Sequence, residues 1–303
     1  MIAESLFLML GALSFRPAVA QAASLPTLPV ARYVAPVYRA PIRRPSTAVG
    51  IATTGKAAML MDGKSGAILF ARNTDTAYPI ASLTKLMTAM VTIDAHLSMD
   101  ESILLAKEDE PPPYEGKPVL TGGETLQRRQ LLQALLVGSV NTAGNALART
   151  YPGGRDAFIA AMNTKAKEIG LDTAEFHDPT GLNPDNVASA QDVARMLQRA
   201  LSYKEIRDIT KNDEAEIKSA SGRVYKILST NLLLNSFLNK KPYTIIAAKT
   251  GSLPQAGFCF AQATQDAAGN ELIAVTLGSN NHFSRYQDVK ALTAWGFGAF
   301  SWE

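Results

Sequence analysis

Short apolar runs indicate strands at both ends of the chain. Residues 57–61 and residues 67–71 are apolar, and the segment between them carries Gly63 and Gly66. Two apolar runs around a glycine-bearing turn predict a β-hairpin. Near the C-terminus, apolar runs predict three more strands, over residues 243–248, 258–262 and 272–277.

Between these strands, apolar positions recur at helical spacing. Residues 82–95 are apolar on nearly every side, which predicts a buried helix. Ser189, followed by Asp192 at the third position after it, resembles a capping box that opens a further helix. The remaining pattern predicts helices over residues 126–137, 142–149, 155–169, 193–201 and 285–297.

Strands from both ends of the chain therefore enclose a helical middle. This order predicts an α+β fold, in which an antiparallel sheet of N- and C-terminal strands packs with helices and the helical middle forms an insertion. We expect one domain over residues 55–303, with no second domain after it. A cleft between the sheet and the helical part is the natural place for a site.

The N-terminal end has a different character. An apolar run over residues 6–13 precedes the small residues Ala20 and Ala22, which fit the small-x-small pattern read by signal peptidase. We therefore expect a signal peptide over residues 1–22 and a periplasmic protein, although this leader contains Glu4 and no basic residue before its apolar run. No later apolar run is long enough to form a membrane-spanning helix.

Residues 23–54 are rich in proline and arginine and have no helical or strand periodicity, so we expect an extended linker. The linker holds Arg32, Arg39, Arg43 and Arg44 and no acidic residue, whereas the whole chain has a formal net charge of +3. Because the basic excess belongs to this segment, the charge does not indicate a nucleic-acid-binding surface.

The content of cysteine and histidine also limits the chemistry. Cys259 is the single cysteine, so the chain cannot form an internal disulfide. The three histidines, His96, His177 and His282, are scattered and show no metal-ligand spacing. We therefore expect neither a metal nor another cofactor.

Ser82 and Lys85 can form a nucleophile and base pair. They lie three residues apart at the start of a predicted helix, so their side chains share one face. Their neighbours are apolar, and burial of this kind disfavours the ammonium form of a lysine. An unprotonated Lys85 could take the proton of Ser82, as a histidine does in other serine enzymes. A serine and a lysine at this spacing are common by chance, so the pair alone is a weak signal.

Two further polar motifs lie downstream. Ser139 and Asn141 fall at the break between two predicted helices. The hydroxyl of Ser139 could relay a proton, and the carboxamide of Asn141 could hold a substrate amide. The alternative is that they cap a helix. An apolar strand is predicted to end at Lys249, Thr250 and Gly251. The lysine and threonine could bind a carboxylate, and the glycine would let another backbone approach closely. The alternative is a solvated lysine at a strand end.

Together, S-x-x-K, S-x-N and K-T-G in this order form a strong signal. The set resembles the penicillin-recognising serine enzymes, which include penicillin-binding proteins and class A β-lactamases. The resemblance extends from about Ala57 to Phe297 and is greatest to low-molecular-mass penicillin-binding proteins, the D-alanyl-D-alanine carboxypeptidases and endopeptidases of the peptidase S11 family. It is carried by residues 79–89, 178–182, 229–233 and 256–257.

The resemblance implies a serine D,D-peptidase that acts on peptidoglycan stem peptides. Ser82 would be the nucleophile, Lys85 its base, and Ser139 the group that passes the proton to the leaving amine with help from Lys249. Asn141 would hold the amide on the acyl side of the scissile bond. β-Lactams would acylate the same serine.

The strand residues would complete the site. By the same resemblance, Lys249 and Thr250 would bind the carboxylate next to the scissile bond. The backbone N–H groups of Ser82 and Ser252 would stabilise the oxyanion. The chain departs from the family after K-T-G, because Ser252, Leu253 and Pro254 replace an aromatic residue or histidine followed by threonine, which affects substrate choice and rate.

Local similarity favours the endopeptidase branch. Residues 151–154 and 158–167 resemble it, and the chain ends about fifty residues after the K-T-G, without the β-rich domain and amphipathic anchor of many carboxypeptidases. The expected reaction is therefore cleavage of D-Ala–diaminopimelate cross-links, with removal of terminal D-alanine as the alternative.

Three other functions remain open. A β-lactamase would need a glutamate to hold the deacylating water, and neither Glu168 nor Glu175 is followed by asparagine at the expected spacing. A catalytically silent peptidoglycan-binding protein could keep the fold, although it would have no need of an intact Ser82 and Lys85. A Ser–Lys esterase would not need the K-T-G.

Overall fold

The computed structural model describes residues 38–45, 50–113 and 117–303. The predicted signal peptide, residues 1–22, lies outside the described residues. Val37–Glu303 forms one compact unit.

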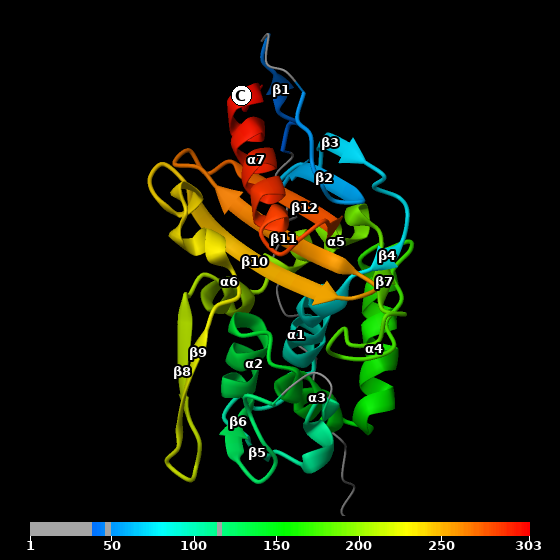
Figure 1. The fold of residues 1–303 in the computed structure, drawn as a ribbon, viewed down its shortest axis with the longest axis vertical. Helices are drawn as coiled ribbons and strands as arrows, with labels where there is room; N and C mark the ends of the chain where they lie inside the picture. The colour runs from blue at the N-terminus through cyan, green and yellow to red at the C-terminus, as the bar shows by residue number, and fades with distance from the viewer. Residues whose placement is uncertain (1–37, 46–49, 114–116) are drawn as a thin grey trace, which may run out of the picture. The chain divides into compact units, whose positions relative to one another are not determined.

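A five-stranded antiparallel sheet joins the two ends of this unit (Figure 1). Its strand order is β10-β11-β12-β2-β3, so strands from the C-terminal part pair directly with a hairpin from the N-terminal part. The predicted hairpin and the three predicted C-terminal strands are therefore confirmed. The strands are β2 (Ala57–Asp62), β3 (Ile68–Arg72), β10 (Thr244–Leu253), β11 (Gly257–Gln265) and β12 (Glu271–Ser279).

Both faces of the sheet are covered by helices. The α7 helix (Ser284–Ala299) packs on one face and α5 (Ala190–Ala200) on the other. Met59 and Leu60, which are neighbours on β2, consequently belong to the cores on opposite sides of the sheet. This burial explains why the strand sequence is apolar throughout instead of alternating.

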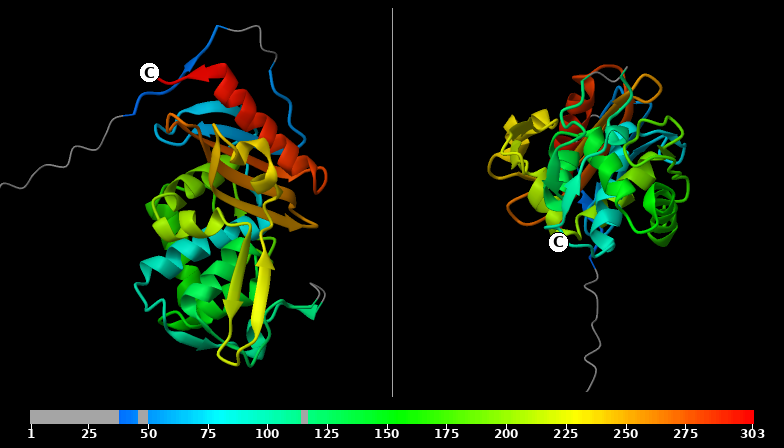
Figure 2. Two further views of the ribbon diagram at one scale, coloured as in Figure 1. Left: turned by 90° about the vertical axis from the view of Figure 1, so that its left-hand side faces the viewer. Right: turned by 90° about the horizontal axis from the view of Figure 1, so that it is seen from below.

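The helical middle of the chain lies beyond the α5 face of the sheet (Figures 1 and 2). Around the central α1 pack helices that bury leucine, alanine and methionine side chains in one core. No helix among the described residues is long and apolar enough to cross a membrane. The central helix is α1 (Thr84–Asp94), and α2 (Arg128–Val137), α3 (Asn141–Arg149) and α4 (Gly154–Glu168) pack against it, whereas α6 (Lys204–Thr210) packs against α2 and β10.

Four pairs of short strands and four 3₁₀ turns connect these elements in the described residues. The pairs are β1 (Ile42–Arg43) with β13 (Phe300–Ser301), β4 (Tyr78–Pro79) with β7 (Val187–Ala188), β5 (Ser102–Leu104) with β6 (Thr125–Gln127), and β8 (Glu214–Lys218) with β9 (Val224–Leu228). The turns are η1 (Ala81–Leu83), η2 (Lys107–Asp109), η4 (Leu232–Asn235) and η5 (Phe237–Asn239).

A buried carboxylate ties the start of the domain to the last helix. Asp288 on α7 accepts hydrogen bonds from the backbone N–H groups of Thr54 and Gly55 and from the hydroxyl of Ser279. Ile42 and Arg43, which lie within the predicted linker, pair with β13. The boundary between linker and catalytic domain at residues 54 and 55 stays a prediction.

Two expectations about local structure were wrong. The K-T-G does not end a strand: β10 continues to Leu253, because its pairing with β11 runs on from Lys249↔Ala261 to Leu253↔Gly257. The helix expected from residue 126 begins at Arg128, because Leu126 and Gln127 pair with β5.

The sequence patterns predicted neither α6 nor the β8–β9 hairpin. In the hairpin, only alternate residues are buried, such as Tyr225 and Ile227, and the exposed positions include Val224 and Leu228. Apolar side chains on both faces of a short strand obscure the alternation on which strand prediction depends.

Candidate active site

Ser82 and Lys85 meet at the start of α1. Ser82 lies on η1, immediately before the helix, and not on α1 itself as predicted. The Lys85 side chain is fully buried, and its Nζ donates to Ser82 Oγ at 2.8 Å. It also donates to Asn141 Oδ1 at 2.7 Å and to the carbonyl oxygen of Thr180 at 2.6 Å. Lys85 is therefore held at hydrogen-bond distance from the hydroxyl that it is expected to deprotonate.

A loop over residues 178–182 packs against η1, the turn that carries Ser82. Ala81 has a φ of +48°, a left-handed conformation that is strained for a residue with a Cβ. The loop presents Gly181 against it: a Cβ built on Gly181 would lie 1.9 Å from the Ala81 carbonyl oxygen. Asp178 shapes the loop by accepting hydrogen bonds from the backbone N–H groups of Thr180 and Gly181. The strained backbone before the serine thus depends on close contact with a glycine.

Ser139 and Asn141 project from the break between α2 and α3. Ser139 has a φ of +58°, another strained position, and Val140 is extended before α3 begins at Asn141. The Ser139 hydroxyl accepts a hydrogen bond from Lys249 Nζ at 2.8 Å, while the Asn141 side chain accepts from Lys85. These side chains do not cap α3, since its N-cap residue is Val140 and no side chain forms a cap hydrogen bond there. The helix-cap alternative is therefore wrong.

The K-T-G segment of β10 forms the opposite wall. Lys249 is 1% exposed and points toward Ser139, whereas Thr250 Oγ1 donates to Thr230 Oγ1 at 2.7 Å. The solvated-lysine alternative is therefore wrong. Burial, with smaller contributions from the positive charges of Lys85 and Arg285, lowers the pKa of Lys249 well below its ordinary value.

Gly251 allows β10 to pass directly over the nucleophile. A Cβ built on this residue would lie 2.9 Å from the carbonyl oxygen of Ile80 and 3.0 Å from the backbone nitrogen of Ser82. No larger residue fits there without movement of one backbone. The close approach brings the backbone of Ser252, the next residue, beside the N-terminal turn that carries Ser82.

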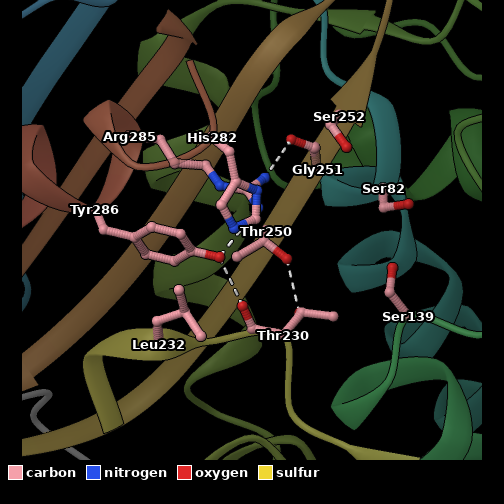
Figure 3. Close-up of a pocket in the computed structure, with 10 residues that line it drawn as sticks. All are labelled: Ser82, Ser139, Thr230, Leu232, Thr250, Gly251, Ser252, His282, Arg285 and Tyr286. Carbon is pink, nitrogen blue, oxygen red and sulfur yellow. Dashed lines mark hydrogen bonds between the residues drawn. The ribbon is translucent and has the colours of Figure 1, made fainter. Parts of the chain in front are cut away.

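These groups surround a cavity of about 260 Å³ (Figure 3). Ser82 and Ser139 lie at one end and Arg285, His282 and Tyr286 at the other. Lys85, Asn141 and Lys249 are not among the residues that line the cavity. Its lining consists of Ser82, Ser139, Thr230, Leu232, Thr250, Gly251, Ser252, His282, Arg285 and Tyr286.

Sequence reasoning missed the end of the cavity that α7 and its preceding loop provide. Arg285 is buried and donates from Nη1 to the carbonyl oxygen of Gly251 at 2.9 Å and from Nη2 to the hydroxyl of Tyr286 at 3.0 Å. Thr230 joins this network, because its carbonyl oxygen accepts from that hydroxyl at 2.8 Å. The similarity of residues 229–233 to the family pointed to Thr230, whereas an arginine at a predicted helix start gave no signal.

The electrostatics of the cavity suit an anion. The guanidinium of Arg285 lines the cavity with Thr250, and its Nε is buried with no hydrogen-bond partner. Burial and the charge of Arg285 lower the pKa of His282. Within the described residues, no group of three or more His, Cys, Asp or Glu side chains could hold a metal ion.

The glutamates considered for a β-lactamase lie elsewhere. Glu168 forms an ion pair with Lys165 at 3.5 Å, and Glu175 contacts His177 at 3.0 Å. Neither lines the cavity that contains Ser82.

Sequence comparisons agree with the geometry. A family model described as D-alanyl-D-alanine carboxypeptidase, peptidase S11, matches residues 44–281. The D-alanyl-D-alanine endopeptidases of Pseudomonas aeruginosa and Escherichia coli are each 32% identical to the chain, over 240 and 242 residues. Each alignment covers 78% of this chain and 76% of the relative.

Solved structures share the fold. The Streptomyces K15 DD-transpeptidase matches with a TM-score of 0.75 at 26% identity, covering 83% of this chain and 100% of that one. Penicillin-binding protein D2 from Listeria monocytogenes, in its ampicillin-bound form, matches with a TM-score of 0.70 at 27% identity, covering 82% and 100%. The predicted α+β architecture is therefore confirmed.

The contact between Gly181 and Ala81 can be tested by substitution. Gly181→Ala would add left-handed strain, about 1–2 kcal/mol, and a backbone clash, so we expect it to lower the free energy of unfolding by about 3 kcal/mol or more. Urea denaturation measures this. The control is Gly222→Ala, where φ is +90° but nothing lies within 4 Å, so that only the strain is added. Equal losses in the two variants would contradict the argument.

Proposed function

The chain belongs to the peptidase S11 family of D-alanyl-D-alanine peptidases, serine hydrolases of peptidoglycan metabolism, and we propose that it acts through an acyl-enzyme on Ser82. The observation that carries the proposal is the buried Lys85 with its Nζ 2.8 Å from Ser82 Oγ. A lysine held in this way needs no histidine to activate the serine.

The first half of the reaction forms the acyl-enzyme. Lys85 takes the proton of Ser82 while Oγ bonds to the carbonyl carbon of the penultimate D-alanine. Backbone N–H groups of Ser82 and Ser252 stabilise the oxyanion, and each such donor is worth about 2.7–4 kcal/mol in the transition state. The C–N bond then breaks, and the leaving amine receives its proton from Ser139, which Lys249 contacts. The proton that Lys85 took from Ser82 is passed to Ser139, so that Lys85 is neutral again when the acyl-enzyme has formed.

The second half of the reaction releases the acyl group. A water molecule attacks the ester carbonyl carbon and gives a proton to Lys85. The Ser82 oxygen then leaves the carbonyl carbon and receives this proton from Lys85. Asn141 holds the amide on the acyl side throughout. It is itself fixed by Lys85, which donates to its Oδ1.

The substrate carboxylate next to the scissile bond binds on β10. Thr250 Oγ1 and Lys249 provide the polar contacts, and Arg285 supplies a guanidinium group nearby. A carboxylate there would also favour the ammonium form of Lys249, whose pKa is lowered by burial.

Cross-link cleavage is the preferred reaction. The support is that the relatives from Pseudomonas aeruginosa and Escherichia coli are both named D-alanyl-D-alanine endopeptidase. We place the enzyme in the periplasm, with residues 1–22 as the export signal and residues 23–54 as a linker. β-Lactams would acylate Ser82, in keeping with the ampicillin-bound relative from Listeria monocytogenes.

Labelling with a fluorescent penicillin tests the acyl-enzyme. We expect a stable covalent label on the wild-type protein and none on Ser82→Ala, which should lose peptidase activity by about 10⁴-fold or more. A thermal melt confirms that the variant is folded. Rapid loss of the label would identify a β-lactamase. A wild-type protein that takes no label would point to an esterase or a silent binding protein.

The pH dependence tests the role of Lys249. Below its pKa this lysine is charged and attracts the substrate carboxylate; above it the attraction is lost. We therefore expect kcat/KM for a D-alanyl-D-alanine peptide to fall as pH rises through a value below the ordinary lysine pKa of about 10.4. A matched peptide with a C-terminal amide should lack this fall. A fall of the same size for both peptides would exclude the proposed contact.

Purified cross-linked muropeptide dimers test the substrate preference. We expect the wild-type enzyme to convert them to monomers by cutting the D-Ala–diaminopimelate bond, as seen by chromatography. Dimers that stay intact while a pentapeptide loses its terminal D-alanine would make the enzyme a carboxypeptidase instead.

A further inference from the structure

One leucine lines the cavity instead of packing in the core. Leu232, Leu233 and Leu234 follow one another on η4, and the last two are buried. Leu232 is 47% exposed and forms part of the cavity wall. Leu232 differs from other exposed leucines, such as Leu104, because it lines the cavity that contains Ser82, where a bound substrate can cover it.

The position of Leu232 is fixed by the residues before it. Asn231 Oδ1 accepts from the backbone N–H of Leu233 at 2.9 Å, and its Nδ2 donates to Gln262 Oε1 on β11 at 3.3 Å. The carbonyl oxygen of Thr230 accepts from the Tyr286 hydroxyl at 2.8 Å. The leucine is therefore presented by a turn that is anchored to the sheet and to α7.

Leu232 and Tyr286 lie side by side at the end of the cavity away from Ser82 (Figure 3). The Tyr286 hydroxyl is already engaged, because it donates to Thr230 and accepts from Arg285. We call this region, formed by Leu232, Tyr286 and His282, the leaving-group corner. Leu232 gives it an apolar surface beside the charge of Arg285.

The proposed function determines which part of the substrate meets this corner. With the scissile carbonyl carbon on Ser82 and the carboxylate at Thr250, the α-carbon of the leaving residue lies between Ser82 and the corner. Its side chain can then extend toward Leu232, which lines the same cavity as Ser82 and Thr250. A terminal D-alanine offers only a methyl group there, whereas the diaminopimelate of a cross-link offers a chain of three methylenes that ends in polar groups.

We propose that Leu232 is a specificity residue that favours leaving residues with a long aliphatic side chain, and thereby cross-linked stems over terminal D-alanine. This inference rests on the proposed function. The methylenes lose contact with water against Leu232, and each buried methylene favours association by about fourfold. Since Leu232 is half-exposed, the polar far end of the chain can reach solvent without being desolvated.

A methylene series measures this contact directly. The substrates are peptides that end in D-Ala-D-Xaa, in which the last residue is D-alanine, D-aminobutyrate, D-norvaline or D-norleucine. For the wild type we expect kcat/KM to rise about two- to fourfold with each added methylene. In Leu232→Ala and Leu232→Asn the rise should fall to less than about 1.5-fold for each methylene, while Leu232→Met should retain it.

The matched control is Leu104→Ala, which removes another exposed leucine from β5, outside the cavity, and should keep the wild-type rise. A wild-type rate that does not depend on side-chain length would overturn the inference, as would an unchanged rise in both Leu232→Ala and Leu232→Asn. In either case, hydrolysis of the D-alanine peptide would leave the proposed function standing. A wild type that hydrolyses no peptide of the series would refute the proposed function itself.

Discussion

Burial of two lysine side chains, each beside a serine, is the constraint on which the site depends. Lys85 is fully buried and Lys249 is 1% exposed. Lys249 is close enough to Lys85 and Arg285 for both positive charges to act on it. Their nitrogens donate to oxygens of Ser82 and Ser139, so the site stabilises them with hydroxyl, amide and carbonyl dipoles. Burial lowers the pKa of Lys249 well below its ordinary value, and the cationic groups around the cavity suit the anionic substrate that we propose.

The surrounding fold keeps these groups together by close backbone contacts. The 178–182 loop presses against the turn before Ser82, and β10 crosses the same turn at Gly251. Both contacts involve a glycine where a Cβ would collide with backbone atoms of the nucleophile turn. Ala81 and Ser139 adopt left-handed backbone conformations, so strain is concentrated at the two serine segments and is maintained by the packing around them.

The two ends of the cavity would contact different parts of the proposed substrate. The end that contains Ser82 and Ser139 would contact the acyl group, which is the same in the carboxypeptidase and endopeptidase reactions. In the reaction that we propose, the other end, with Arg285 and Leu232, would meet the leaving residue, which is the only part of the substrate that differs. Selectivity in such an enzyme can therefore change through a few side chains without disturbing the lysines.

The sequence by itself determined the five strands of the main sheet, most of the helices and three motifs with distinct chemistry, because these depend on local periodicity and on residue type at short spacing. Ser82, Lys85, Ser139, Asn141 and Lys249 could be proposed in this way, and the structure brings all five side chains together. Only the tertiary structure decided that the K-T-G lies inside β10, since cross-strand pairing extends a strand beyond its apolar run. It also brought Arg285, Tyr286 and Leu232 into the cavity, because contacts between residues more than 50 positions apart leave no periodic signal.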